Sequence, residues 1–166
     1  MVSSSLRKKI ILWKDSATVL PVKWIQPENL HVTIIPPWYE ESSKVIKILT
    51  TNPLSIPSFS LHFTDIGPGP TSHNPRLLWT TAEAAPELVD IRSFFQKLLP
   101  VSLEKRPFVP HVTIGKLFTP IHAPTIIPPF HLTFSHIERI SRVFLVESFL
   151  HPKGAIYNPL LTIPLL

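Results

Sequence analysis

The tetrapeptide His-Val-Thr-Ile occurs twice in this chain of 166 residues, at His31–Ile34 and again at His111–Ile114. Each copy follows a proline-containing segment, "QPENL" at 26–30 in the first case and "PFVP" at 107–110 in the second. Both copies read as short β-strands, in which the histidine and threonine project from one face and the valine and isoleucine from the other. The aliphatic pair predicts an anchor in the core, so the imidazole and hydroxyl are presented on the opposite face.

Each repeat combines two functional groups that suit reactions at phosphorus. A histidine can accept or donate a proton near neutral pH, and a threonine hydroxyl can donate a hydrogen bond to a phosphoryl oxygen. Two such strands facing across a bound phosphorus would supply a general base and a general acid for in-line displacement. This apparatus requires no metal ion. The repeat therefore indicates acid–base catalysis on a phosphate ester.

The shorter pattern His-x-Thr also occurs at His62 and at His131, so by itself it is weak evidence. A half-exposed strand histidine is the plain alternative for any single copy. Two features distinguish the copies at 31 and 111, namely their identity through the fourth residue and the proline-containing turn before each. Asp65 replaces the fourth, aliphatic residue after His62, and Phe134 replaces it after His131. The remaining histidines read as loop or strand-edge residues: His73, His122, His136 and His151.

Composition limits the class of protein further. Lys and Arg total 16 against 11 Asp and Glu, a formal charge of +5 that favours polyanions such as RNA, DNA or a phosphorylated ligand. The absence of cysteine excludes disulfides and thiolate metal sites, and it fits a reducing, cytoplasmic setting. No H-x-x-x-H pattern or compact carboxylate cluster accompanies the histidines, so we expect neither a metal nor another cofactor. No apolar run suits a signal peptide or a membrane span, and we expect a soluble monomer, although the sequence contains no direct signal for oligomeric state.

Twenty prolines divide the chain into short elements. Helical periodicity predicts helices over 4–14, 40–49 and 86–99. Strand patterns predict strands over 22–25, 30–35, 59–66, 76–82, 111–114, 130–140 and 142–150, the last closing a hairpin through 151–163, with a turn at 27–29. Helices between mostly antiparallel strands predict an α+β fold that forms one domain over residues 1–166.

The longer motifs resemble a known family. "WIQPENLHVTI" (24–34) and "RPFVPHVTIGK" (106–116), with "PRLLW" (75–79) between them and "VESFL…KGAIY…TIPL" near the end, are similar to the two-histidine (2H) phosphoesterase superfamily. The most similar branch is the RNA 2′,3′-cyclic phosphodiesterases, often labelled 2′-5′ RNA ligases. The resemblance runs from Val22 to the C-terminus. It implies a bilobal α+β fold with a pseudo-two-fold axis and two mostly antiparallel sheets flanking a central cleft, with helices outside and one H-x-T strand from each lobe.

The resemblance also implies residue roles. In such proteins the paired histidines are the acid and the base and the paired threonines hold the phosphate, which assigns these roles here to His31, His111, Thr33 and Thr113. Lys116 stands where many relatives have an arginine, so the positive charge is retained without the planar bidentate fork.

Three further residues are candidates for substrate binding. Trp38 and Tyr39 follow the first repeat and could stack on a base, although aromatic residues beside prolines more often serve packing. Arg76 in "NPRLLW" could reach the phosphate, and the plain alternative is a solvated arginine at the start of a strand.

The implied activity is metal-independent opening of a 2′,3′-cyclic phosphate at an RNA 3′ end to leave a 2′-phosphate. By microscopic reversibility the same site could join such an end to a 5′-hydroxyl. The alternative is a non-catalytic RNA-binding module with a degenerate cleft, because relatives usually begin with an apolar strand whereas this chain enters its first helix from "MVSSS". Retention of all four His and Thr residues favours the enzyme.

Overall fold

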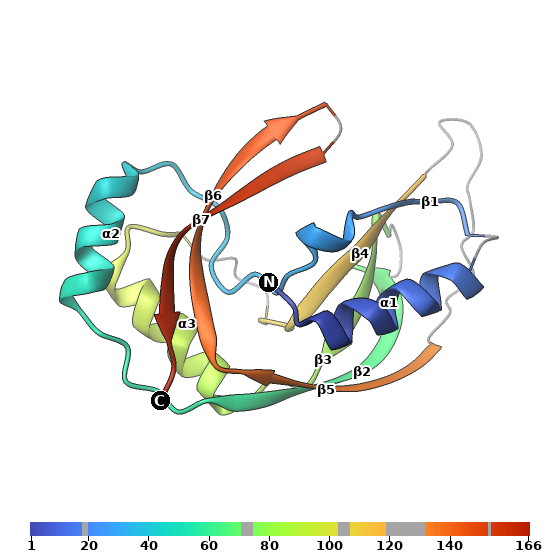
Figure 1. Ribbon diagram of the computed structural model, residues 1–166, viewed down its shortest axis with the longest axis horizontal. Coiled ribbons are helices and arrows are strands. Elements are labelled where there is room, and N and C mark those ends of the chain that lie inside the picture. The colour runs from blue at the N-terminus through green and yellow to red at the C-terminus, as the bar shows by residue number, and fades with distance from the viewer. Residues whose placement is uncertain (18–19, 71–74, 103–106, 119–131, 153) are drawn as a thin grey trace. The chain divides into compact units, whose positions relative to one another are not determined.

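The computed structural model describes residues 1–166 except 18–19, 71–74, 103–106, 119–131 and 153 (Figure 1). Its helices are α1 (Ser4–Ser16), α2 (Ser42–Thr51), α3 (Pro86–Leu98) and the 3₁₀ helix η1 (Pro27–Asn29). Its strands are β1 (Val22–Trp24), β2 (Phe59–Gly69), β3 (Leu77–Ala82), β4 (His111–Leu117), β5 (Leu132–Ile140), β6 (Arg142–His151) and β7 (Gly154–Pro164). The predicted α+β class is confirmed.

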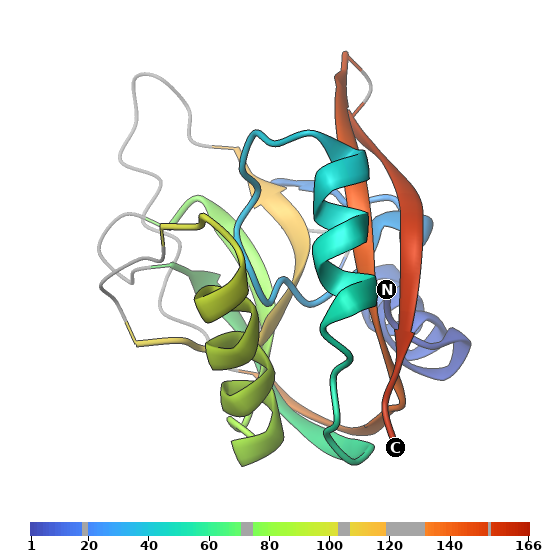
Figure 2. The ribbon, with the colours of Figure 1, turned by 90° about the vertical axis from the view of Figure 1, so that its left-hand side faces the viewer.

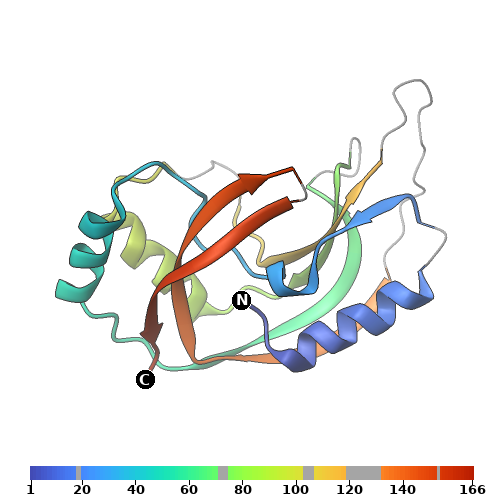
Figure 3. The same ribbon diagram turned by 45° about the horizontal axis from the view of Figure 1, so that its top comes forward.

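The strands form two sheets. Five strands make one sheet in the order β1-β4-β3-β2-β5, and β6 and β7 form a separate two-stranded sheet. The β1–β4, β3–β4, β2–β3 and β6–β7 pairs are all antiparallel. Figure 3 shows β6 and β7 as one long hairpin, as the sequence predicts for the C-terminal segment.

The chain divides into two compact units, which are described separately here. Unit 1 comprises residues 1–32, 62–83 and 109–138, and unit 2 comprises residues 33–61, 84–108 and 139–166. The chain passes between the units within β2 and within β5. Both units are therefore assembled from three separate segments of the sequence.

In unit 1, α1 packs against one face of the five-stranded sheet. Trp13 of α1 meets Trp24 of β1 edge to face, with ring centroids 6.1 Å apart, and the Lys14 ammonium lies over the Trp24 ring. We call the face of the sheet against which α1 packs the helix face. Buried core residues of this unit include Leu6, Ile10, Val22, Phe63, Ile66, Leu78, Val112 and Ile114.

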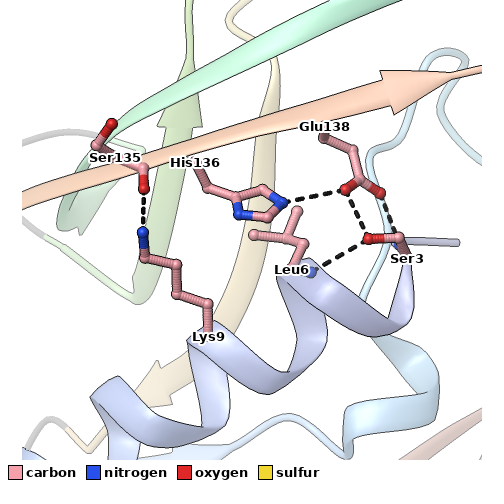
Figure 4. A network of polar contacts seen from close by, with 6 residues as sticks. All are labelled: Ser3, Leu6, Lys9, Ser135, His136 and Glu138. Atoms are coloured by element: carbon pink, nitrogen blue, oxygen red, sulfur yellow. Dashed lines mark hydrogen bonds and ion pairs between the residues drawn. The ribbon is translucent and has the colours of Figure 1, made fainter.

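A polar network fixes the start of α1 to β5 (Figure 4). Ser3 caps the helix by accepting a hydrogen bond from the Leu6 N–H. The Glu138 carboxylate, 5 % exposed, accepts hydrogen bonds from the Ser3 N–H at 2.6 Å and the Ser3 hydroxyl at 2.7 Å. His136 Nε2 lies 3.3 Å from Glu138 Oε2, so this histidine belongs to a structural network within β5. A carboxylate at the positive end of α1 also stabilises the helix dipole.

In unit 2, α2 and α3 lie beside each other, and α2 contacts β7 (Figure 2). Their apolar stripes are buried: Val45 and Leu49 in α2, and Leu88, Ile91 and Phe95 in α3. α3 begins at Pro86 as predicted and ends at Leu98, with Leu99 as its C-cap. α2 begins two residues later than predicted, because Glu41 takes the N-cap position instead of the first turn.

The prediction of a strand over 30–35 is wrong. Only Val32 pairs with another strand, through one antiparallel bridge to Val112. The 3₁₀ helix η1 ends just before this segment, and Ile34 and Ile35 form a bend ahead of Pro36-Pro37. Because proline has no N–H to donate to a ladder, pairing cannot continue beyond the bend.

Residues 1–3 precede α1 and lie outside the strands. The Val2 N–H donates a hydrogen bond to the Leu30 C=O at 3.1 Å. This bond links the start of the chain to the residue immediately before the first repeat.

Candidate active site

The second repeat occupies the first half of β4, a central strand of unit 1. Val112 and Ile114 are 0 % and 2 % exposed on the helix face, whereas His111 and Thr113 are only half-buried. The predicted aliphatic anchor is thus confirmed for this copy. Across β3, Thr81 is opposite His111 and Trp79 is opposite Thr113, so these residues share the second face of the sheet. We call it the histidine face.

The first repeat reaches the same face by its single bridge. Val32 is paired with buried Val112, so both valines project to the helix face. Alternation then directs His31 to the histidine face, beside Thr113 in the antiparallel register. Continued by one residue on each side of the bridge, this register would make His31 and His111 diagonal neighbours on that face.

Both histidines belong to unit 1, and the first segment of that unit ends at Val32. The resemblance implies one H-x-T strand from each lobe, and this grouping differs from it. The reason is that Val32 pairs directly with Val112, so the two repeats are adjacent along one edge of β4. Thr33 is the first residue of unit 2, and its role beside the phosphate stays a prediction.

The two imidazoles are held in the same way. His31 Nδ1 lies 2.7 Å from the Asn29 carbonyl oxygen, and His111 Nδ1 lies 2.8 Å from the Val109 carbonyl oxygen. In each case the acceptor belongs to the residue two positions earlier in the proline-containing turn. A carbonyl oxygen can only accept, so Nδ1 carries the hydrogen and the lone pair of a neutral ring is on Nε2. Each ring therefore presents Nε2 as its proton-transfer atom.

The surroundings of His31 favour its neutral form. Burial lowers the pKa of His31 below its usual value of 6.5, the Asn29 carbonyl opposes this, and repulsion from the N-terminal amine and from His111 lowers it further. His31 therefore stays neutral to a lower pH than a solvent-exposed histidine would.

Trp79 is a site residue that the sequence interpretation did not identify. Its indole stacks on the His111 imidazole, with centroids 3.7 Å apart and an interplanar angle of 20°. The ring also covers Gly69 of β2, where a Cβ atom would lie 2.5 Å from Trp79 Cδ2. Trp79 Nε1 is buried and has no hydrogen-bond partner among the described residues, so stacking and packing hold the indole in place. The sequence signal that could have identified Trp79 was the pair of glycines in "GPG" at 67–69 of β2.

A β-bulge brings Lys116 to the histidine face. Trp79 pairs with Thr113, but Leu78 pairs with Gly115, which leaves Ile114 as an extra residue in β4. Strict alternation would direct Lys116 to the helix face with Val112. The extra residue reverses the alternation, so Lys116 is opposite Leu77, two positions from Trp79 on β3. Its exposed side chain can thus serve the same face as the histidines.

The other predicted binding residues have different surroundings. Arg76 precedes β3, and its C=O accepts a hydrogen bond from the Leu117 N–H, so alternation directs its exposed side chain to the helix face. Trp38 and Tyr39 belong to unit 2, Trp38 half-buried and Tyr39 exposed. Their roles in substrate binding, and that of Arg76, stay predictions.

The His-x-Thr copy at His62 does not share the geometry of the repeats. His62 in β2 lies 3.4 Å from the Ser135 hydroxyl through Nε2. His131 lies outside the described residues, as do His73 and His122. His151 is exposed at the end of β6.

The described part of the chain contains no group of three or more His, Asp or Glu side chains arranged to hold a metal ion. In the same residues, no helix combines the length and the apolar character that a membrane span requires.

Known proteins resemble this chain in sequence. A family model described as the 2′-5′ RNA ligase superfamily matches residues 13–148. An RNA 2′,3′-cyclic phosphodiesterase of Archaeoglobus fulgidus is 27% identical over 165 residues, covering 96% of this chain and 93% of the relative. A protein of the same name from Methanocaldococcus jannaschii is 28% identical over 118 residues, covering 70% of this chain and 67% of the relative.

Solved structures show the same fold. The protein TT0787 of Thermus thermophilus matches with a TM-score of 0.78 at 20% identity, covering 98% of this chain and 93% of that one. E. coli LigT complexed with 3′-AMP matches with a TM-score of 0.75 at 20% identity, covering 99% of this chain and 94% of that one. With the family model matching 13–148, through both histidine repeats, the chain belongs to the 2′-5′ RNA ligase superfamily.

Proposed function

We propose that this protein hydrolyses the 2′,3′-cyclic phosphate at an RNA 3′ end to a 2′-phosphate, without a metal ion, through His31 and His111. The observation that carries the proposal is the matched pair of imidazoles on one sheet face, each with Nδ1 bound to a carbonyl two residues upstream. The names of the relatives, RNA 2′,3′-cyclic phosphodiesterases, supply the substrate class.

The two proton transfers of the reaction need one neutral and one protonated imidazole. The neutral ring accepts a proton at Nε2 from a water molecule while the water oxygen attacks phosphorus. The bond from phosphorus to O3′ breaks in line, and the protonated ring donates its Nε2 proton to the departing O3′. The products are a 2′-phosphate and a 3′-hydroxyl, and exchange with solvent restores both rings.

The lowered pKa of His31 supports part of this scheme, because a neutral imidazole is then available at neutral pH. The equivalent hydrogen bonding of both rings also supports exchange of their roles. With a 5′-hydroxyl in place of water as the nucleophile, the same steps would form a 2′-5′ bond. The requirement for one neutral and one protonated ring predicts a rate that falls at both acidic and alkaline pH.

Five further residues complete the proposal. The Thr33 and Thr113 hydroxyls donate hydrogen bonds to the non-bridging phosphoryl oxygens, and the Lys116 ammonium adds positive charge on the face of the sheet that carries Thr113. Trp38 and Tyr39 offer planar rings on which a base of any identity could stack.

The test is turnover of a nucleoside 2′,3′-cyclic phosphate, with the product identified as the 2′- or the 3′-phosphate. We expect the 2′-phosphate, at a rate unchanged by excess EDTA. Loss of activity on chelation that a divalent ion restores would replace this mechanism by a metal-hydroxide one. Absence of turnover with retained RNA binding would favour the alternative, a non-catalytic RNA-binding module.

A further inference from the structure

Two lysines meet at the edge of the five-stranded sheet in unit 1. Lys23 in β1 is paired directly with Lys116 in β4, and both side chains are exposed. Residues opposite each other in an antiparallel pair project from the same face with Cβ atoms about 4.5–5.5 Å apart, and like charges there are destabilising. Among the residues that the structure describes, neither lysine forms an ion pair. The pair is therefore a local concentration of positive charge that lacks an anion.

The pair is on the histidine face. The bulge at Ile114 places Lys116 opposite Leu77 on the side of the sheet that carries Trp79, Thr113 and His111. Lys23 shares this side because it is opposite Lys116, whereas its neighbours Val22 and Trp24 project to the helix face against Gly115 and α1. The sequence interpretation did not identify Lys23, since an isolated lysine in a short strand carries no signal.

Distance along the strand separates the pair from the catalytic groups. Thr113 and Lys116 are opposite Trp79 and Leu77, so they are one step apart on the same face, and a step of two strand residues is about 6.8 Å. The ammonium groups extend further still on their flexible stems. When the histidines and Thr113 hold the cyclic phosphorus, Lys23 is therefore near the next nucleotide of a longer ligand.

We propose that Lys23 and Lys116 together bind a backbone phosphate of an RNA strand, so that the site takes oligonucleotides ending in a 2′,3′-cyclic phosphate in preference to mononucleotides. The inference rests on the proposed function and specifies its substrate class. Two ammonium groups are point charges without a fixed hydrogen-bonding plane, so they suit a phosphodiester and read no base. The net charge of +5 on the chain favours the same polyanionic ligand.

The first experiment compares kcat/KM for a nucleoside 2′,3′-cyclic phosphate and for a trinucleotide with the same end at low salt. We expect a higher value for the trinucleotide. Lys23→Ala should lower that value about three- to tenfold, the worth of one exposed ionic contact to a phosphate, and leave the mononucleotide value unchanged. Lys47→Ala is the matched control, because it removes one exposed charge on α2 in unit 2 and should change neither value. Equal losses on both substrates, or equal effects of the two variants, would overturn the proposal.

A charge reversal separates binding from folding. Lys23→Glu would replace a like-charged cross-strand pair by an opposite-charged pair with Lys116, so the melting temperature should rise. The trinucleotide kcat/KM should nevertheless fall below that of Lys23→Ala. A lower melting temperature would contradict the cross-strand placement on which the proposal depends.

A binding experiment tests the lysine pair without turnover. The ligand is a trinucleotide with a terminal 2′-phosphate, titrated calorimetrically at a series of salt concentrations. Removing one contact to a single-strand phosphate should reduce the slope of log K against log salt by about 0.7 in Lys23→Ala. An unchanged slope refutes the lysine site even if the enzyme is active. A reduced slope in a protein that hydrolyses neither substrate refutes the proposed function and leaves the RNA-backbone site in place.

Discussion

The two HVTI segments have identical sequences and different backbone structures. The second is part of a seven-residue strand with partners on both sides, whereas the first makes one bridge between a 3₁₀ helix and a proline-terminated bend. Their histidines nevertheless make the same hydrogen bond, from Nδ1 to the carbonyl two residues upstream. The two segments therefore share the turn that precedes the histidine. This hydrogen bond does not need a regular strand.

The segments differ in what surrounds each ring. His31 is desolvated, which lowers its pKa, and its neighbour Leu30 accepts a hydrogen bond from the Val2 N–H. His111 is instead stacked on Trp79, which rests against Gly69. One ring is tuned chiefly by burial and the other is positioned chiefly by an aromatic partner.

The largest expected effect is loss of either histidine. His31→Ala and His111→Ala should each lower turnover of a nucleoside 2′,3′-cyclic phosphate by about 10²- to 10⁴-fold, the usual worth of a positioned acid or base. The double variant should lose much less than the product of the two, because groups that act as a unit are not additive. His62→Ala is the control, since the Nε2 of this ring lies 3.4 Å from the Ser135 hydroxyl of β5, and the variant should keep near-normal turnover. His131→Ala tests the second decoy, and a folded variant as damaged as His111→Ala would show that the wrong repeats have been paired.

The next largest effect should come from Trp79. Trp79→Leu removes the surface against which His111 is stacked, and a misplaced catalytic group costs up to about 10²-fold in rate. We expect a fall in kcat of about tenfold or more, with partial rescue by Trp79→Phe. Trp13→Leu is the control, because Trp13 packs on the helix face, and it should lower stability without lowering kcat.

Gly69→Ala probes the same stack from the neighbouring strand. The new Cβ would lie 2.5 Å from the indole, so Trp79 must shift relative to His111. We expect kcat to fall and near-ultraviolet circular dichroism to change while far-ultraviolet circular dichroism is retained. Normal kcat despite a displaced indole would contradict a positioning role for Trp79.

A smaller effect is expected from the threonines. Thr33→Val and Thr113→Val each remove one hydroxyl that would hold a phosphoryl oxygen, and a lost hydrogen bond costs about 0.5–1.5 kcal/mol net, or roughly two- to tenfold in kcat/KM. Because no proton transfer is lost, the shape of the pH profile should not change. If one variant were silent and the other severe, the two repeats would not serve the same phosphate in equivalent ways.

The smallest effect concerns stability and pH. Because the folded-state pKa of His31 is lowered from 6.5, the unfolded chain binds more protons than the folded one as pH falls below about 6.5. This group therefore lowers the free energy of unfolding progressively from that pH downward, until its folded form is also protonated. Urea unfolding of His31→Gln at pH 7, 6 and 5 should show a shallower decline than the unsubstituted protein. An equal decline in both would mean that His31 is as solvated as in the unfolded chain.

Local sequence predicted most of the secondary structure because its signals are local. The apolar stripes of α1 and α3, Pro86 at the start of α3 and the alternation in β4 each follow from residues close in the chain. The same signals failed at 30–35, since a strand needs a partner over its length and Pro36-Pro37 prevents one. The pairing of the two repeats as candidates also came from sequence, through their identity and their resemblance to a family that the comparisons confirm.

Only the tertiary structure decided how the site is surrounded. Trp79, which stacks on His111, lies against Gly69 of a neighbouring strand, and the pKa of His31 is lowered by burial and by repulsion from the N-terminus and His111. The histidine-face position of Lys116, and its pairing with Lys23, follow from one bulge in the β3–β4 register. Sequence determines which way a side chain points along a regular strand, because alternation is a property of the chain alone. A bulge, a register or a ring stack is set by which strands meet, and that is decided when distant segments pack together.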